Sequence, residues 1–156
     1  MKIDTNEEVF TSDKVAAAAG CSEATLRQWR NRYAFLENTV TGGMEVKRFS
    51  LSDICVVRAI KVLTDYGLSA RDAIYLANHR MGLRKLFAAL LSKSHRVQTL
   101  LSIRPGKSEH EAFEFSLFGP EHFAEAMAHS GGIMTVFDLN VVVQHVFNHF
   151  EQQNKK

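Results

Sequence analysis

The chain has 156 residues, of which 46% are apolar and 10% aromatic, enough to bury the core of one moderate domain or of two small ones. Its formal net charge of +2, from 19 basic and 17 acidic residues, is too small to indicate nucleic-acid binding by itself. With only two cysteines, neither a disulfide scaffold nor a zinc cluster is expected. The sequence has no signal-peptide pattern and no apolar run of about 20 residues, which argues against secretion and membrane insertion. We therefore expect a reduced cytoplasmic protein without a cofactor.

Residues 10–32 have the pattern of two short helices joined by a glycine-containing turn. Thr11 can cap the first helix, Gly20 ends it, and Ser22 can cap the second. This pattern predicts a helix–turn–helix, which places its second helix in the major groove of DNA. Trp29 lies on the predicted inward face of that helix, where burial is favoured over a functional role.

A short wing is expected after the second helix. Residues 33–47 contain Gly42 and Gly43, a pair that suits the tip of a hairpin. Ser50 and Asp53 have the spacing of a capping box, which predicts a helix that runs to Tyr66. The same spacing recurs at Ser69 and Asp72 and predicts a shorter helix to about His79.

A longer helix is predicted from Leu83 to Leu101, and its apolar stripe has two interpretations. The stripe packs either on the chain's own core or on a partner helix in a dimer. The residues assigned to dimerisation are Leu83, Phe87, Leu90, Val97 and Leu101. Residues 104–108, with Pro and Gly, have the composition of a linker.

In the last third of the chain, the sequence pattern predicts a strand around residues 113–117 and a helix over 120–129. It then predicts a strand over 134–137 and a final helix over 138–152. Two copies of this unit can pair their strands into a shared sheet, or its aromatic residues can line a small effector pocket. Oligomerisation or protein contact is the favoured interpretation, because the segment has much apolar surface and few convergent polar groups. The aromatic and aliphatic residues concerned are Phe113, Phe115, Val136 and Phe137.

Three linked motifs resemble the N-terminal DNA-binding domain of the MerR family of bacterial transcription regulators. Residues 22–29, SEATLRQW, are similar to the family's recognition helix. Residues 48–53, RFSLSD, are similar to the end of its wing and the following helix start, and residues 63–69, LTDYGLS, to the pattern before its next helix. The resemblance covers about residues 8–79.

The resemblance implies a homodimer that binds pseudo-palindromic promoter DNA and, in many members, distorts it to activate transcription. It also implies that the dimer depends on a long helix directly after the domain. The family's metal sensors carry cysteines after that helix, whereas this chain has none beyond Cys55, so a thiolate metal sensor is not expected.

The expected fold is mainly α with a small β part. We expect a winged helix–turn–helix domain over residues 1–80, a linking or dimerisation helix over 81–104, and a small α+β dimerisation or regulatory unit over 105–156.

Basic side chains concentrate in residues 27–48, which hold five of them against two acids. Such side chains neutralise phosphates and release counterions, while Gln28 and the Thr25 methyl group can contact base edges. The predicted DNA-binding residues are Ser12, Lys14, Thr25, Arg27, Gln28, Arg30, Arg32, Lys47 and Arg48. Residues 80–107 hold seven basic side chains and no acid, interpreted as a solvated helix face.

No catalytic or metal-binding pattern emerges, so an enzyme is not expected. His145 and His149 have metal-ligand spacing on a helix but no third ligand nearby. The leading hypothesis is a bacterial or phage transcription regulator that binds promoter DNA as a homodimer, with RNA polymerase or another regulatory protein as a further candidate partner. Two alternatives remain open: a DNA-bending architectural or excisionase-like factor, and a protein–protein adaptor.

Overall fold

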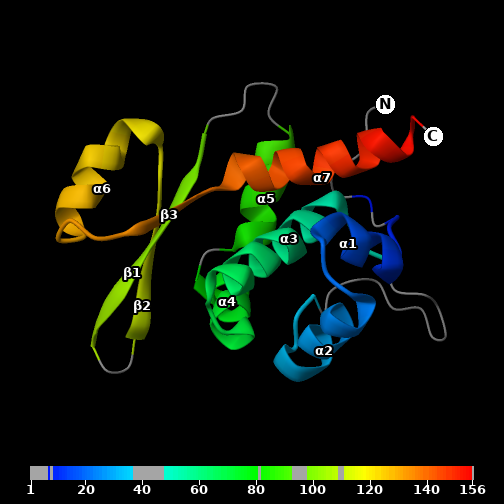
Figure 1. The fold of residues 1–156 in the computed structure, drawn as a ribbon, viewed down its shortest axis with the longest axis horizontal. Helices are drawn as coiled ribbons and strands as arrows, with labels where there is room; N and C mark the ends of the chain where they lie inside the picture. Colours follow the sequence, from blue (N-terminus) through cyan, green and yellow to red (C-terminus); the bar gives the residue numbers. More distant parts are fainter. Residues whose placement is uncertain are drawn as a thin grey trace. The chain divides into compact units, whose positions relative to one another are not determined.

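The computed structural model describes residues 7, 9–36, 48–80, 82–92, 98–108 and 111–155. The chain divides into two compact units (Figure 1). Unit 1 comprises residues 1–93 and 142–156, and unit 2 comprises residues 94–141. Mainly helical structure with one small sheet agrees with the predicted fold class.

Unit 1 is built from helices. Two short helices at its start are followed by a longer one, a short one that continues as a π-helical turn, and a helix of ten residues; the second part of the last helix of the chain completes the unit. They are α1 (Ser12–Ala19), α2 (Glu23–Tyr33), α3 (Leu51–Tyr66), α4 (Ala70–Tyr75), the turn Leu76–Arg80, α5 (Leu83–Ser92) and α7 (Leu139–Gln153).

Side-chain caps fix the starts of three helices in unit 1, and all three were predicted. Ser22 caps α2 and Ser69 caps α4, each by accepting a hydrogen bond from a backbone N–H three residues on. At α3, the Ser50 N–H donates to Asp53 Oδ2 over 2.8 Å, and the Asp53 N–H donates to Ser50 Oγ over 3.2 Å. Gly20 ends α1 with a φ of 77°, in the left-handed region that favours glycine.

Apolar side chains from α1, α2, α3 and α5 form the core of unit 1. α3 supplies the largest share, because its residues are buried on almost every face. Phe10 and Phe49 form an isolated antiparallel bridge that ties the start of the chain to the residue before the α3 capping box. Trp29 is 6% exposed, which confirms its predicted burial.

Unit 2 contains a three-stranded antiparallel sheet in the order β2-β1-β3. Its strands are β1 (Leu100–Ser108), β2 (Glu111–Phe118) and β3 (Thr135–Asp138). Between β2 and β3 lie a short 3-10 helix, η2 (Pro120–His122), and α6 (Phe123–His129) (Figure 1).

The register gives the sheet two different faces. Leu101 pairs with Leu117 and Phe137, so these three side chains lie on one face, which is apolar. Ser102 pairs with Ser116 and Val136, and the opposite face, which also carries Leu100 and Arg104 of β1, is mixed. Strand β1 is therefore the centre of a sheet with one apolar face and one mixed face.

The helix predicted from Leu83 to Leu101 is wrong in its second half. α5 ends at Ser92, and Leu100 to Ser108 form the central strand instead. Residues 104–108, predicted as a linker, are part of that strand. Proline is tolerated there because β1 pairs with β3 only up to Ile103 and the β1–β2 ladder is irregular between Pro105 and Ser108.

The predicted dimerisation residues do not form one helical seam. Leu83, Phe87 and Leu90 are at most 6% exposed, on an α5 that packs against α3. Leu101 lies on β1, and Val97 lies outside the described residues. The stripe on α5 therefore belongs to the chain's own core, which was the other interpretation of the pattern.

Two further differences concern the extent of the parts. The final helix was assigned to the C-terminal unit, but from Val142 onwards it belongs to unit 1. Of the predicted wing, residues 33–47, the segment 37–47 with Lys47 lies outside the described residues. Within the described part of the chain, no helix has the length and apolar character to cross a membrane.

Candidate nucleic-acid interface

Helix α2 buries one face and exposes the other. Leu26 and Trp29 are 1% and 6% exposed and anchor the helix in the core of unit 1. Arg27, Gln28 and Arg32 are exposed. Because the helix is held by its buried face, these three polar side chains are presented to the outside on a fixed support, as a recognition helix requires.

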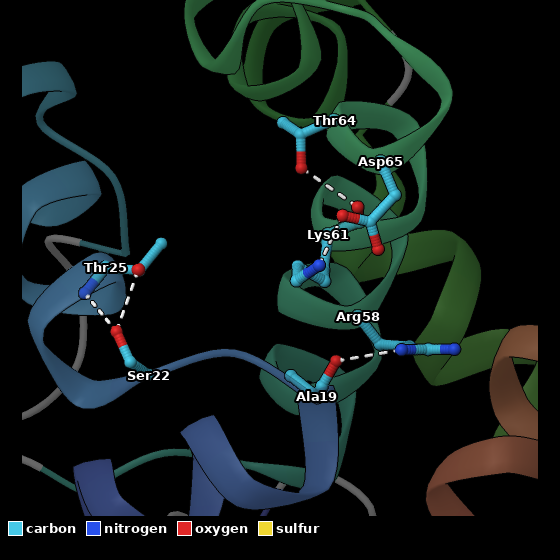
Figure 2. A network of polar contacts seen from close by, with 7 residues as sticks. All are labelled: Ala19, Ser22, Thr25, Arg58, Lys61, Thr64 and Asp65. Atoms are coloured by element: carbon cyan, nitrogen blue, oxygen red, sulfur yellow. Dashed lines mark hydrogen bonds and ion pairs between the residues drawn. The ribbon is translucent and has the colours of Figure 1, made fainter.

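Thr25 is already engaged by the cap of α2. Its hydroxyl lies 2.8 Å from Ser22 Oγ, and its backbone N–H donates to the same oxygen over 3.0 Å (Figure 2). The hydroxyl of Thr25 is therefore part of the α2 cap, and its predicted methyl contact to thymine stays a prediction.

A small pocket of about 80 Å³ lies where the start of α1 meets α2. It brings Ser12 of α1 together with Arg27 and Arg30 of α2, three of the predicted DNA-binding residues. Asn31 lines the same pocket and was not predicted, although its position four residues after Arg27 places it on the same side of the helix. Glu23 also lines it and gives the pocket one acidic wall.

Arg30 combines surface and core contacts. Its guanidinium carbon lies 4.9 Å from the centroid of the buried Phe49 ring, within cation–π distance. Burial lowers the pKa of Arg30, and the charge of Asp53 opposes this, so the side chain remains a cation at neutral pH. Arg30 was predicted only as a DNA contact, whereas the structure also gives it a packing role.

The other predicted cations that the structure describes lie at the surface. Lys14 is exposed on α1, and Arg48 is exposed directly before Phe49. Arg48 Nη1 donates a hydrogen bond to the Val9 carbonyl over 3.3 Å, which ties the residue after the wing to the start of the chain. Together with Arg27 and Arg32, these are exposed cations on or near the helix–turn–helix; Arg71 and Lys85 are exposed elsewhere in unit 1.

Arg58 of α3 is a residue that the sequence analysis missed. Its Nη1 donates a hydrogen bond over 3.1 Å to the Ala19 carbonyl at the C-terminal end of α1 (Figure 2). A Cβ added at Gly20 would lie 2.9 Å from the same nitrogen. Glycine at the turn therefore leaves room for Arg58 to bond to the end of α1. The sequence signal that could have pointed to Arg58 is a charged residue within an otherwise apolar helix.

Lys61 and Asp65 form an ion pair one turn further along α3 (Figure 2). Thr64 in the same turn donates from its hydroxyl to the Lys61 carbonyl over 2.9 Å. Lys61 is therefore partly neutralised within its own helix.

Two of the basic residues predicted as a solvated face are paired internally. Arg84 Nε lies 2.8 Å from Oδ1 of Asp53, whose side chain is fully buried in the α3 capping box. Arg104 Nε lies 2.7 Å from Glu114 Oε2, and its Nη1 donates to the His129 carbonyl. These two arginines stabilise units 1 and 2 respectively.

Unit 2 has a larger pocket of about 490 Å³ between its sheet and α6. The residues predicted to line an effector pocket, Phe113, Phe115, Val136 and Phe137, do not line this pocket. Other residues of β2 line it instead. Phe113 and Phe115 lie on the opposite face of β2 from Ser116, which lines the pocket. The lining is mixed: Ser102, Arg104, Ser116, Leu117, Phe118, His122, Glu125, Ala126 and His129.

The histidine pair on α7 has other contacts. His149 lies with Nε2 3.0 Å from Gln153 Nε2, and its ring packs edge-on against Phe150. Burial lowers the pKa of His145, and the charges of Arg58 and His149 lower it further. In the part of the chain that the structure describes, no group of three or more His, Cys, Asp or Glu side chains is arranged to hold a metal ion.

Two helices joined by the turn at Gly20, the second anchored by Leu26 and Trp29 with Arg27 and Arg32 exposed, define a helix–turn–helix. Residues 10–79 match the model of the MerR HTH family regulatory proteins. This segment is thus a MerR-family helix–turn–helix domain, the DNA-binding domain of a class of transcription regulators. The match ends before α5, and no curated protein matches the chain.

Proposed function

We propose that the protein regulates transcription by binding specific promoter sequences as a homodimer, with α2 in the major groove and the wing beside it. The observation that carries the proposal is the exposed polar face of α2, which lies next to the pocket shared by Ser12, Arg27 and Arg30. A domain built only for protein contact has no need to gather cations around the start of the first helix of a helix–turn–helix.

Different residues of this face have different proposed roles. Arg27, Arg32 and Arg48 neutralise phosphates, and the α1 start with Ser12 adds a hydrogen-bond donor to the backbone of the same strand. Gln28 is the side chain placed to read a base edge, because an amide can pair bidentately with adenine. Lys14 and Lys47 add to the non-specific attraction.

Selection of bound duplexes from random DNA tests the proposal. An enriched motif with two related half-sites supports a sequence-specific dimer, and the spacing of the half-sites reports its geometry. A promoter fusion to the selected site then separates a regulator from an architectural DNA-bending factor, which binds without changing transcription. Failure to shift any duplex at low salt, where electrostatic attraction is strongest, supports the adaptor instead.

A salt series on variants tests the assigned residues. Arg27→Ala together with Arg48→Ala is expected to reduce the slope of log affinity against log salt by about 2, because each lost phosphate contact removes about one released counterion. Lys107→Ala is the matched control, since Lys107 is exposed on β1 in unit 2. Wild-type affinity of the double variant across the series contradicts the proposed surface.

A further inference from the structure

Strand β2 has one hydrogen-bonding edge without a partner among the residues that the structure describes. It lies at one side of the sheet in the order β2-β1-β3, and its ladder to β1 is regular from Phe113 to Phe118. Edge strands of natural proteins are usually protected by charged side chains, especially lysine, or by proline, a bulge or short length. β2, with the sequence EAFEFSLF, is eight residues long and contains neither lysine nor proline, and the charge of its Glu114 is paired with Arg104 of β1.

The side chains along this edge are also suited to contact. Phe113 and Leu117 are each 36% exposed, and the Phe113 and Phe115 rings lie 6.3 Å apart on the same face. The other outer strand, β3, has only four residues and leads directly into α7. A long edge with partly exposed aromatic residues is therefore confined to one side of the sheet.

We propose that β2 pairs antiparallel with β2 of a second copy of this chain and joins the two sheets into one of six strands. This inference rests on the proposed function, because it supplies the homodimer contact that the buried α5 stripe does not provide.

The sequence of β2 selects the register of this pairing. Directly opposed residues of two antiparallel strands share a face of the sheet. The two-fold axis that relates the two copies of β2 must therefore lie between two copies of the same residue, which oppose each other. Two such registers centre on the middle of the strand. Centring on Glu114 opposes two carboxylates, whereas centring on Phe115 opposes Phe115 to itself, Phe113 to Leu117, and Glu114 to Ser116.

The Phe115-centred register is therefore self-complementary. It brings aromatic and aliphatic side chains into direct cross-strand pairs and leaves each Glu114 beside a neutral hydroxyl. Glu114 also keeps its ion pair with Arg104 of its own chain, so no uncompensated charge enters the contact.

Substitution of Ser116 tests both the edge and the register. Ser116→Glu places a carboxylate opposite Glu114 of the second copy, twice by symmetry, and is expected to weaken dimerisation by about tenfold. Ser116→Gln has nearly the same size without the charge and is expected to weaken it much less, while Ser116→Lys is expected to match or exceed the affinity of Ser116→Gln. Ile133→Glu adds the same charge at a 75% exposed position of unit 2 and serves as the control.

Sedimentation equilibrium of the full chain without DNA gives the dimer dissociation constants, and circular dichroism shows that each variant is folded. A monomeric wild-type chain overturns the proposal, as does equal dimerisation of Ser116→Glu and Ser116→Lys. DNA binding is measured separately, so a monomer that still shifts DNA overturns the β2 contact alone. A dimer that follows the charge series but binds no DNA overturns only the proposed function.

Discussion

The guanidinium group of Arg30 lies over the ring of Phe49, with its carbon 4.9 Å from the ring centroid. Arg30 belongs to the candidate recognition helix, and Phe49 follows the segment predicted as the wing. The contact therefore joins the two segments proposed to touch DNA, and it uses the same side chain that lines the pocket beside Ser12.

Arg30→Ala is expected to lower the free energy of unfolding by about 1 kcal/mol, because it removes the cation–π contact and the packing of the side-chain stem. Arg27→Ala is expected to change it by less than about 0.5 kcal/mol, since Arg27 is exposed. Urea unfolding followed by circular dichroism measures both. Equal stability of the two variants would show that the contact with Phe49 contributes nothing.

Asp53→Ala is expected to cost about 3 kcal/mol, because the carboxylate caps α3 and pairs with Arg84 while fully buried. Asp72→Ala removes the equivalent carboxylate at the exposed start of α4, where it accepts a hydrogen bond from Ser69 Oγ, and is expected to cost about 1 kcal/mol. Urea unfolding gives the loss in the free energy of unfolding for each variant. The difference between the two losses is the contribution of burial and of the ion pair with Arg84. A similar loss in both variants contradicts this assignment.

Neither described cysteine is expected to react quickly with a thiol reagent. Burial raises the pKa of Cys55 to about 12 and also raises the pKa of the half-buried Cys21. The thiolate is the reactive form, so both residues are almost entirely thiol at pH 7. Labelling with Ellman's reagent is expected to be slow in the native protein and complete in urea, and fast native labelling of either residue contradicts the prediction.

His145 is expected to make the protein less stable as the pH falls. Because its folded pKa is lowered, the unfolded chain binds more protons near the ordinary pKa of 6.5, and the free energy of unfolding decreases as pH falls through that region. The effect is small, since His145 is largely exposed.

The test compares the melting temperature of the wild type with that of His145→Gln at pH 7.5 and pH 5.5. The wild type is expected to lose more on acidification than the variant does. An identical loss in both would assign the pH dependence to other groups.

Local signals in the sequence predicted the local structure of unit 1 well. Ser22, Ser50 and Ser69 start helices because a serine cap depends only on the next three residues. Gly20 ends α1 for an equally local reason, since its positive φ is a property of that turn. These features needed no knowledge of distant contacts.

The errors concern structure that depends on distant partners. Leu100 and Leu101 continue an apolar spacing compatible with a helix, but pairing with β2 and β3 on both sides makes them a strand. Arg30 was assigned to DNA alone because its contact, Phe49, is 19 residues further along the chain. The Arg58 bond to the Ala19 carbonyl spans 39 residues, so an arginine within the apolar α3 sequence is visible but its partner is not.

Unit 1 is discontinuous in sequence, and this has a consequence for its synthesis. The rings of Phe10 and Phe150 lie 5.0 Å apart, so the segment directly before α1 meets the last helix of the chain in the same unit. A nascent chain still attached to the ribosome has made α1 to α5 but lacks the segment from Val142 that completes their packing. Unit 1 therefore becomes complete only after the whole of unit 2 has been synthesised, and chains that terminate before Val142 are left with an unfinished unit 1.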